Sequence, residues 1–454
     1  MDESNNWRVD PHDIAALMIK YYQDLFTSSK PNAQGADLNH IPNVITNHRN
    51  AALIAHFRDD EVKEALKQMA PLKAPGPDGM PPLFYQHFWG VVDRDVTNSV
   101  LSWLNTGTIP HPINHTFITL IPKIKNPEFV TNYCPISLCN VLYKIFSKVL
   151  ANRLKNILPT IIMEHQSAFT KNRLIYDNIL VAFESLHSMN NMNSGKMGYM
   201  AIKLDMSKAY NRVEWGYLEN EMRKMGFNER WVRLIKACVK SVTYSILING
   251  KPQGFIQPTR GICQGDPLSP FLFLLCTEGL HGLIQHAANM GEIKGFPLCW
   301  RCPALTHLLF ADESLLFCRA TSDECRKIID ILEKYEGESG QKVNKNKTTI
   351  FFSKSTAEAT KQEIMAALGL QEIVHFEQYL GLPSLVGRRK KEGFNFIKEK
   401  VWRKLQGWEG KLLSQAGREL LIKVVIQAIP AYAMGCFKIP LGLCHEIETI
   451  IKKF

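Results

Sequence analysis

Long apolar runs are rare in this sequence of 454 residues. The most apolar stretch, FLFLLCTEGL from Phe271 onward, is about half as long as the roughly 20 residues that a helix needs to cross a bilayer. The N-terminal stretch MDESNNWRVDPHD is acidic and polar, so it resembles neither a signal peptide nor a transit peptide. The sequence therefore predicts a protein that does not enter a membrane.

A framework of regularly spaced cysteines is also lacking, although the chain has 11 cysteines. Cys299 and Cys302 form a CxxC pair, but no second pair of cysteines or histidines follows at the spacing of a zinc module. The pair is either half of a metal site or two ordinary thiols, and the spacing favours the thiols. Apolar neighbours around Cys276 and Cys318 indicate buried, reduced thiols and an intracellular protein. Whether that protein is nuclear or cytoplasmic stays open.

Internal repeats and low-complexity tracts are absent as well. The length predicts two or three domains, and we expect the chain to continue, because EIETIIKKF ends inside a helical pattern without a cap. Lys and Arg number 54 against 43 Asp and Glu, which gives a net charge of +11. Such a surplus favours a polyanionic partner, nucleic acid before an acidic membrane, although surface solubility explains it equally well.

The expected secondary structure mixes helices and strands without regular βαβ alternation, which favours an α+β fold. Helical patterns cover 12–29, 59–70, 231–242, the segment from Pro270 and a segment near 322–337, and basic helical patterns continue through 402–425. A proline- and glycine-rich loop is expected at 71–82, a strand at 199–206, and hairpins from Tyr244 and over 308–317.

Two adjacent acids stand inside the apolar run HLLFADESLLF. We expect Leu308–Phe310 and Leu315–Phe317 to be strands, with the acids Asp312 and Glu313 in the four-residue turn 311–314. Acids at such a tip either sit in solvent or serve a site. Asp205 ends another predicted strand, AIKLD. If the two strands share a sheet, Asp205 and Asp312 meet, and their repulsion is relieved by a cation such as Mg²⁺.

A resemblance to a known family strengthens the second alternative. Eight blocks occur in order: KAPGPDG (73–79), LIPKIKNPEFVTNYCPISLCNVLYKIFSKVLANRL (120–154), QSAFTKNRLIYDNILVAFE (166–184), AIKLDMSKAYNRVEW (201–215), GICQGDPLSPFLF (261–273), LLFADESLLF (308–317), SGQKVNKNKT (339–348) and YLGLP (379–383). Together they resemble the reverse transcriptase of non-LTR, LINE-type retrotransposons, as found in plant genomes, over essentially the whole chain.

The resemblance implies a right-hand polymerase with fingers, palm and thumb, and an antiparallel palm sheet. We expect an N-terminal helical extension at 1–70, fingers with part of the palm at 71–198, the palm at 199–375, and the primer grip with a partial thumb at 376–454. The implied activity is RNA-directed DNA polymerase. The implied partners are an RNA template, a DNA primer and deoxynucleoside triphosphates, without a membrane, and the oligomeric state stays open.

The family's site residues carry over by motif. Asp205 and Asp312, with Glu313 beside them, match the catalytic acids that bind Mg²⁺, or alternatively Mn²⁺. Two such ions activate the primer 3′-hydroxyl and stabilise the leaving pyrophosphate.

The remaining matches concern the nucleotide and the primer. Tyr210 matches the gate that excludes a ribose 2′-hydroxyl. Gln264 and Gly265 match a loop that approaches the template–primer or the incoming nucleotide. Lys123 is expected to face phosphate or simply solvent, and Lys347 either to protonate pyrophosphate or to form basic surface. Leu380 and Gly381 match the primer grip, followed by basic helices suited to a thumb.

Three positions depart from the family pattern. Cys134 replaces the arginine expected to grip the triphosphate, Asn211 replaces an aspartate, and Glu313 replaces the second aspartate of FADD. Cysteine has neither the charge nor the reach of arginine. Glutamate moves its carboxylate by about 1.5 Å, whereas Mg²⁺ requires near-ideal geometry. We therefore expect a degenerate copy with severely impaired activity. The alternatives are an inactive nucleic-acid-binding remnant, a maturase-like RNA-binding factor, or no function.

Overall fold

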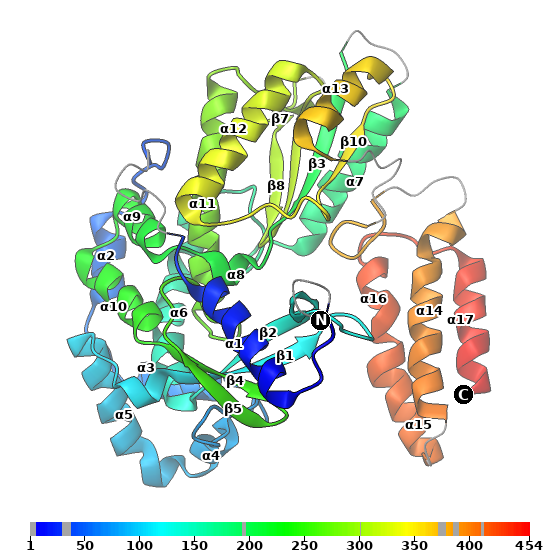
Figure 1. Ribbon diagram of the computed structural model, residues 1–454. Coiled ribbons are helices and arrows are strands. Elements are labelled where there is room, and N and C mark those ends of the chain that lie inside the picture. Colours follow the sequence, from blue (N-terminus) through cyan, green and yellow to red (C-terminus); the bar gives the residue numbers. More distant parts are fainter. Residues whose placement is uncertain are drawn as a thin grey trace. The chain divides into compact units, whose positions relative to one another are not determined.

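A computed structural model describes residues 6–29, 38–192, 197–299, 301–370, 378–384, 390–409 and 413–454. Helices and strands are mixed in an α+β fold with separate sheets (Figure 1), as predicted. The chain divides into two compact units, each built from three segments. Unit 1 comprises Met1–Asn172, Met206–Met290 and Lys327–Asn344, and unit 2 comprises Arg173–Asp205, Gly291–Arg326 and Lys345–Phe454.

Unit 1 contains a sheet with the strand order β2-β1-β4-β5. Its strands are β1 (His115–Pro122), β2 (Tyr133–Cys139), β4 (Thr243–Ile248) and β5 (Lys251–Ile256). β1 pairs antiparallel with β2 and parallel with β4, and β4–β5 is the predicted hairpin. The parallel pairing of β1 and β4 joins segments far apart in the sequence, so no local sequence pattern predicts it.

Unit 1 also contains helices. They are α1 (Pro11–Phe26), α2 (Asn47–Ile54), α3 (Asp59–Lys67), α4 (Pro82–His87), α5 (Trp89–Thr106), α6 (Val141–Ile161), α8 (Ala209–Arg212), α9 (Trp215–Met225), α10 (Glu229–Lys240) and α11 (Ser269–Asn289). α1 begins where the Asp10 side chain accepts from the amides of His12 and Asp13 and Pro11 fixes the first turn. α6 and α11 are apolar on most sides, because both are largely buried.

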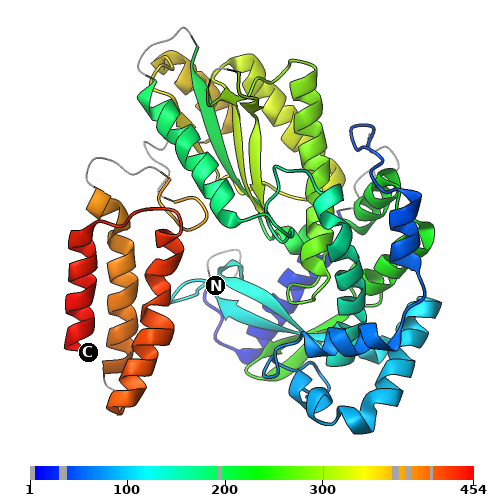
Figure 2. The same cartoon turned by 180° about the vertical axis from the view of Figure 1, so that it is seen from behind.

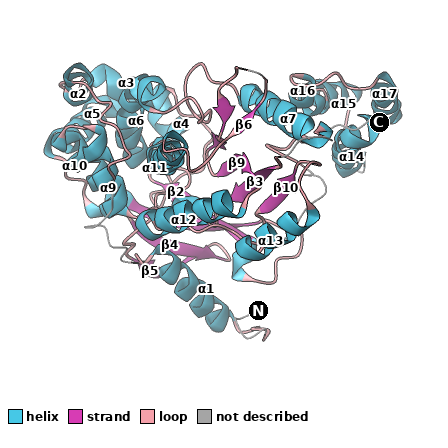
Figure 3. Cartoon of the chain, turned by 90° about the horizontal axis from the view of Figure 1, so that it is seen from above, coloured by secondary structure: helices cyan, strands magenta, loops and turns pink. Residues whose placement is uncertain are grey.

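Unit 2 contains an antiparallel sheet with the order β10-β3-β9-β8. Its strands are β3 (Tyr199–Asp205), β8 (His307–Phe310), β9 (Glu313–Arg319) and β10 (Thr349–Phe352). α7 (Ile175–Asn191) lies along one face (Figure 2, blue-green), and α13 (Glu358–Leu368) covers the other (Figures 1 and 3). Ala182, Leu186 and Met189 of α7 form one apolar cluster with buried residues of all four strands. A sheet covered on both faces explains why its strands are nearly continuously apolar.

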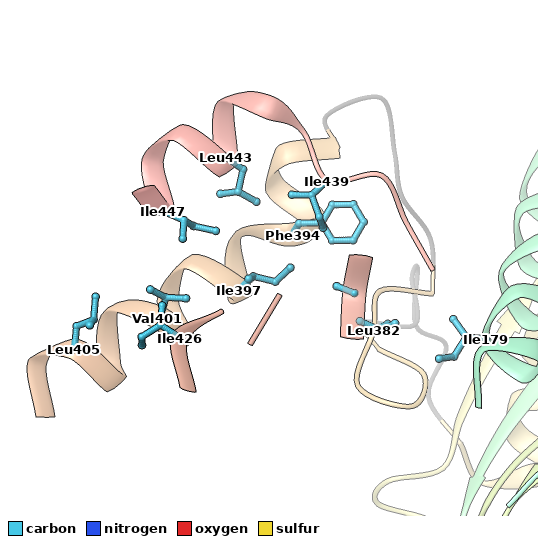
Figure 4. Close-up of a cluster of buried hydrophobic side chains, with 11 residues drawn as sticks. Ile179, Leu382, Phe394, Ile397, Val401, Leu405, Ile426, Ile439, Leu443 and Ile447 are labelled. Atoms are coloured by element: carbon cyan, nitrogen blue, oxygen red, sulfur yellow. The ribbon is translucent and has the colours of Figure 1, made fainter. Parts of the chain in front are cut away.

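The C-terminal part of unit 2 is a bundle of α14 (Lys390–Glu409), α15 (Gln415–Leu421), the π-helical turn Ile422–Ile426, α16 (Ala428–Met434) and α17 (Leu441–Lys453). Phe394, Ile397 and Val401 of α14 form its core with residues of the π-helical turn, α16 and α17 (Figure 4). Leu382 and, from α7, Ile179 belong to the same buried cluster. The helical prediction for 402–425 is confirmed at 402–409 and 415–425. Residues 410–412 lie outside the described residues.

Most predicted elements are confirmed, among them α1, α3, the loop before Pro82, β3, α10, α11 and α12 (Ser322–Ser339). The predicted four-residue turn at 311–314 is wrong. Phe310 pairs directly with Glu313, so the turn comprises only Ala311 and Asp312, and Glu313 is the first residue of β9. Ala311 takes the left-handed backbone (φ 52°) that tight two-residue hairpins require.

The cysteine prediction needs one correction. Cys299 and Cys302 are joined by a disulfide, with Cα atoms 5.4 Å apart, which lies within the usual range for such a bond. They are therefore neither a metal half-site nor two free thiols. Cys276 and Cys318 are free and buried, as expected. No helix among the described residues is long and apolar enough to span a membrane.

Candidate active site

Two acids face each other at the end of the unit 2 sheet. Asp205 is the last residue of β3 and lies opposite Glu313, the first residue of β9. Directly opposed residues of an antiparallel pair place their side chains on one face. Asp312, in the adjoining turn, adds a third carboxylate. The two strands thus share a sheet, and the residue paired with Asp205 is Glu313, next to Asp312.

Repulsion among the carboxylates at this end of the sheet disfavours a state in which all of them are charged. Asp312 is exposed at the hairpin tip, yet the surrounding protein removes part of its hydration and thereby raises the pKa of its carboxyl. The negative charges of Asp205 and Glu313 raise this pKa further, and the ammonium of Lys347 opposes them. Lys347 Nζ lies 3.6 Å from Asp205 Oδ2. Oxygen donors that repel each other suit a hard divalent cation.

The side chain of Glu313 is engaged differently from those of the two aspartates. Its Oε2 accepts a hydrogen bond from the amide of Leu380 at 3.3 Å and lies 3.9 Å from Lys203 Nζ. Lys203 also donates to the carbonyl of Gln378 at 2.8 Å. Among the described residues, no group of three potential ligand atoms within 4.8 Å contains these carboxylates. The residues therefore fit a cation held by Asp205 and Asp312 better than one held by all three acids.

Leu380 and Gly381 form a tight turn. Tyr379 and Leu382 pair across it, and the two central residues have φ values of 49° and 77°. Such values at both positions are typical of a type I′ turn. The turn thus presents main-chain groups next to Glu313, and residues 378–382 together with the acids form one connected group in unit 2.

The other predicted residues lie in unit 1. Tyr210, in α8, stacks its ring on Phe273 of α11, with ring centres 4.9 Å apart and planes at 12°. The carbonyl of Tyr210 accepts a hydrogen bond from the amide of Ile262 at 2.9 Å. The ring is therefore held in place by packing while it stays partly accessible.

Gln264 and Gly265 lie against strand β2. The amide of Ser137 donates to the carbonyl of Gln264 at 2.9 Å. Gly265 has a φ of 122°, and a Cβ there would stand 2.9 Å from the carbonyl oxygen of Ser137. Only glycine combines this backbone conformation with this approach, so the glycine of the CQGD block has a structural cause.

Cys134, the first departure from the family pattern, is half-buried in β2. Its thiol donates to Gln264 Oε1 at 3.4 Å. Beside it, Lys208 Nζ donates to the carbonyl of Tyr133 at 2.6 Å. Asn211, the second departure, is buried, and its carbonyl packs against Gly261. An uncharged side chain is suited to that buried place.

Six lysines and arginines lie within residues 119–155, and some are exposed whereas others make structural contacts. Lys123, at the end of β1, is exposed. Lys144 is buried and donates to the carbonyl of Ala74 at 3.3 Å. Arg153 makes two hydrogen bonds to Glu61, of 2.8 and 2.7 Å, and stacks 3.7 Å over Phe57. Two of the six cations in this region therefore hold the fold together.

Several residues of these sites were missed from the sequence. Asp266 is buried, and the loss of hydration raises its pKa to about 6. Lys203 was read only as part of a strand, and nothing local connects it to Gln378. Tyr432 donates to the carbonyl of Leu380 at 2.8 Å. For Lys203, the one signal in the sequence was a charged residue within the otherwise apolar strand AIKLD.

Comparison with known proteins decides the family. Residues 121–383, more than half of the chain, match the family described as Reverse transcriptase (RNA-dependent DNA polymerase). The chain belongs to this reverse transcriptase family. The predicted enzyme class, RNA-directed DNA polymerase, is confirmed at the level of the family.

Individual relatives extend the match. The chain is 26% identical over 433 residues to the Transposon TX1 uncharacterized 149 kDa protein of Xenopus laevis, covering 94% of this chain and 32% of that protein. It is 27% identical over 258 residues to the Retrovirus-related Pol polyprotein from type-1 retrotransposable element R2 of Popillia japonica, covering 57% and 34%. An uncharacterized mitochondrial protein of Arabidopsis thaliana is 52% identical over 68 residues, which are 15% of this chain and 56% of that protein. The chain thus spans about a third of the first two relatives and just over half of the third.

Proposed function

We propose that this chain is the polymerase part of a non-LTR retrotransposon reverse transcriptase that extends a DNA 3′ end on an RNA template. The observation that carries the proposal is the pairing of Asp205 with the acidic hairpin at the end of an antiparallel sheet. The names of the TX1 and R2 relatives support the retrotransposon origin. The identity to the Arabidopsis protein supports a plant source.

Asp205 and Asp312 would hold the divalent cation, Mg²⁺ or Mn²⁺. When bound, such a cation would neutralise their repulsion, activate the primer hydroxyl and stabilise the leaving pyrophosphate. Lys347, 3.6 Å from Asp205, is suited to balance charge on the departing pyrophosphate. Tyr210, fixed by its stack on Phe273, would limit space at the sugar and so select deoxynucleotides.

The loop with Gln264 and Gly265, held against β2 by the hydrogen bond from Ser137 to Gln264, would approach the nucleotide or template. Lys123 is exposed and available to phosphate. Leu380 and Gly381 would steady the primer end. Within the proposed right hand, the order stays as predicted: extension 1–70, fingers 71–198, palm 199–375, primer grip and thumb 376–454.

We further propose that catalysis by this copy is impaired. Cys134 brings no cation to the triphosphate, and its thiol is turned to Gln264. Glu313 is turned to Leu380 and Lys203. These two contacts also favour a second candidate function, a nucleic-acid-binding remnant without catalysis.

The two functions separate in one experiment. Primer extension on an RNA template, with Mg²⁺ or Mn²⁺, is run beside binding of the same RNA at increasing salt. Slow synthesis that Asp312→Asn abolishes supports the polymerase, and synthesis as fast as an intact family member refutes the impairment. Salt-dependent binding that survives Asp312→Asn, with no synthesis in either metal, supports the remnant.

A further inference from the structure

Leu380 connects two parts of unit 2 through its main chain. Its amide donates to Glu313 Oε2 at 3.3 Å, and its carbonyl accepts from the hydroxyl of Tyr432 at 2.8 Å. Glu313 belongs to the hairpin that carries Asp312, and Tyr432 belongs to α16 of the C-terminal bundle. One residue thus joins the acidic hairpin to the bundle.

The rest of the turn is anchored to the same two parts. Leu382 is buried in the core of the bundle (Figure 4), and Tyr379 is buried in the cluster that covers the sheet. Tyr379 shares that cluster with Leu308 of β8, and Asn178 of α7 donates to the carbonyl of Leu309 in β8, at 2.8 Å. Lys203 of β3 holds the carbonyl of Gln378 just before the turn. The chain around 378–382 is therefore tied to β3, β8 and β9 at once.

The length of the Glu313 side chain matters for this connection. An aspartate is shorter by one carbon–carbon bond of about 1.5 Å. Because the hydrogen bond to Leu380 already measures 3.3 Å, a carboxylate withdrawn by that amount lies beyond hydrogen-bonding reach. A glutamine keeps the reach and an acceptor oxygen, but loses the charge that attracts Lys203.

We propose that Glu313 is a positioning residue, whose carboxylate fixes the 379–382 turn, and through Leu380 and Tyr432 the C-terminal bundle, to the hairpin that carries Asp312. The substitution that departs from FADD is therefore used by this chain and is more than damage at the metal site. The consequence for the primer end rests on the proposed function, whereas the connection itself does not.

Amide hydrogen exchange of the full chain, without metal or nucleic acid, tests the connection at Leu380. Losing a hydrogen bond to a half-exposed carboxylate predicts roughly tenfold faster exchange at Leu380 in Glu313→Asp and Glu313→Ala. Glu313→Gln is expected to stay within about threefold of wild type. Asp312→Asn is the matched control, because it changes the neighbouring acid without touching Leu380, and it predicts unchanged exchange there.

Tyr432→Phe tests the other half of the connection. It removes only the hydroxyl, and we expect the bundle residues beside it to exchange faster while Glu313→Ala transmits part of the same effect. The proposal is overturned if the Leu380 amide exchanges as slowly in Glu313→Asp as in wild type. It is also overturned if that amide exchanges as fast in Asp312→Asn as in Glu313→Ala. Thermal melts of all variants separate local from global unfolding.

A second readout addresses the primer. A fluorescent base at the 3′ end of a primer on an RNA template, in EDTA, reports how firmly the terminus is held. We expect Glu313→Asp and Tyr432→Phe to loosen it about equally, and Asp312→Asn to leave it unchanged. Absence of primer–template binding by every variant, with the exchange result intact, contradicts the proposed function and leaves the positioning role standing.

Discussion

Gly265→Ala gives a direct test of how the CQGD loop is built. The new Cβ meets the carbonyl oxygen of Ser137 at 2.9 Å, in a backbone with φ of 122°. A non-glycine residue in such a conformation costs about 1–3 kcal/mol. Relief of the clash moves the loop away from β2 and weakens the Ser137–Gln264 hydrogen bond, worth about 1 kcal/mol. We therefore expect a loss of about 2–4 kcal/mol in the free energy of unfolding.

Substitutions at two other glycines separate the cost of backbone strain from the cost of the clash with Ser137. Gly291 has a positive φ of 76° but open space around its Cβ position, so Gly291→Ala isolates the backbone strain. Gly90 lies within α5 with neither constraint, so Gly90→Ala is expected to stabilise by about 0.5–1 kcal/mol. Urea unfolding of the three variants measures the order. Gly265→Ala no more destabilising than Gly291→Ala would refute the close approach to Ser137.

Three further predictions concern charge and stability. Burial raises the pKa of Glu221 well above 4.5, with Glu278 adding to the shift; the folded protein keeps a proton that the unfolded chain releases, so stability falls as pH rises above about 4.5. Glu221→Gln is expected to remove that pH dependence. The free energy of unfolding in urea is measured for both proteins from pH 4 to 8, and the same change with pH in the variant as in wild type would contradict this prediction. Cys134→Arg exchanges a weak thiol contact for a triphosphate ligand and should lower the KM for deoxynucleotides by about 10–100-fold, since one or two charge-assisted hydrogen bonds are gained; steady-state kinetics with an unchanged KM would remove Cys134 as a cause of impairment. Arg153→Lys should cost about 2–3 kcal/mol, because the fork to Glu61 is lost, while RNA affinity, measured by filter binding, stays within about twofold.

The places of Asp205 and Asp312 at the ends of strands could be predicted because their signal is local. Asp205 ends an apolar strand and Asp312 interrupts an apolar hairpin, and each pattern is visible within about ten residues. The family motifs then supplied the pairing of the two strands. The length of the hairpin turn was mispredicted, because a two-residue turn depends on Ala311 adopting a left-handed backbone, which alanine rarely signals.

Contacts between distant segments could not be predicted. Glu313 meets Leu380, 67 positions later, and Arg153 meets Glu61, 92 positions earlier. In the sequence Arg153 is indistinguishable from the exposed Lys123, since nothing beside it reveals a buried partner. From the sequence alone, Glu313 likewise indicates only a departure from the FADD motif. The structure adds the hydrogen bond that its carboxylate accepts from the amide of Leu380.

Asp205 is the residue on which the proposed RNA-templated DNA synthesis depends most directly. The most direct measurement is single-turnover incorporation of one deoxynucleotide into a DNA primer annealed to RNA, with Mg²⁺ or Mn²⁺, comparing wild type, Cys134→Arg and Cys134→Arg with Asp205→Asn. We expect slow, template-matched incorporation by wild type, faster incorporation by Cys134→Arg, and none once Asp205 is replaced. Firm primer–template binding by all three proteins, with no incorporation by any of them in either metal, would contradict it.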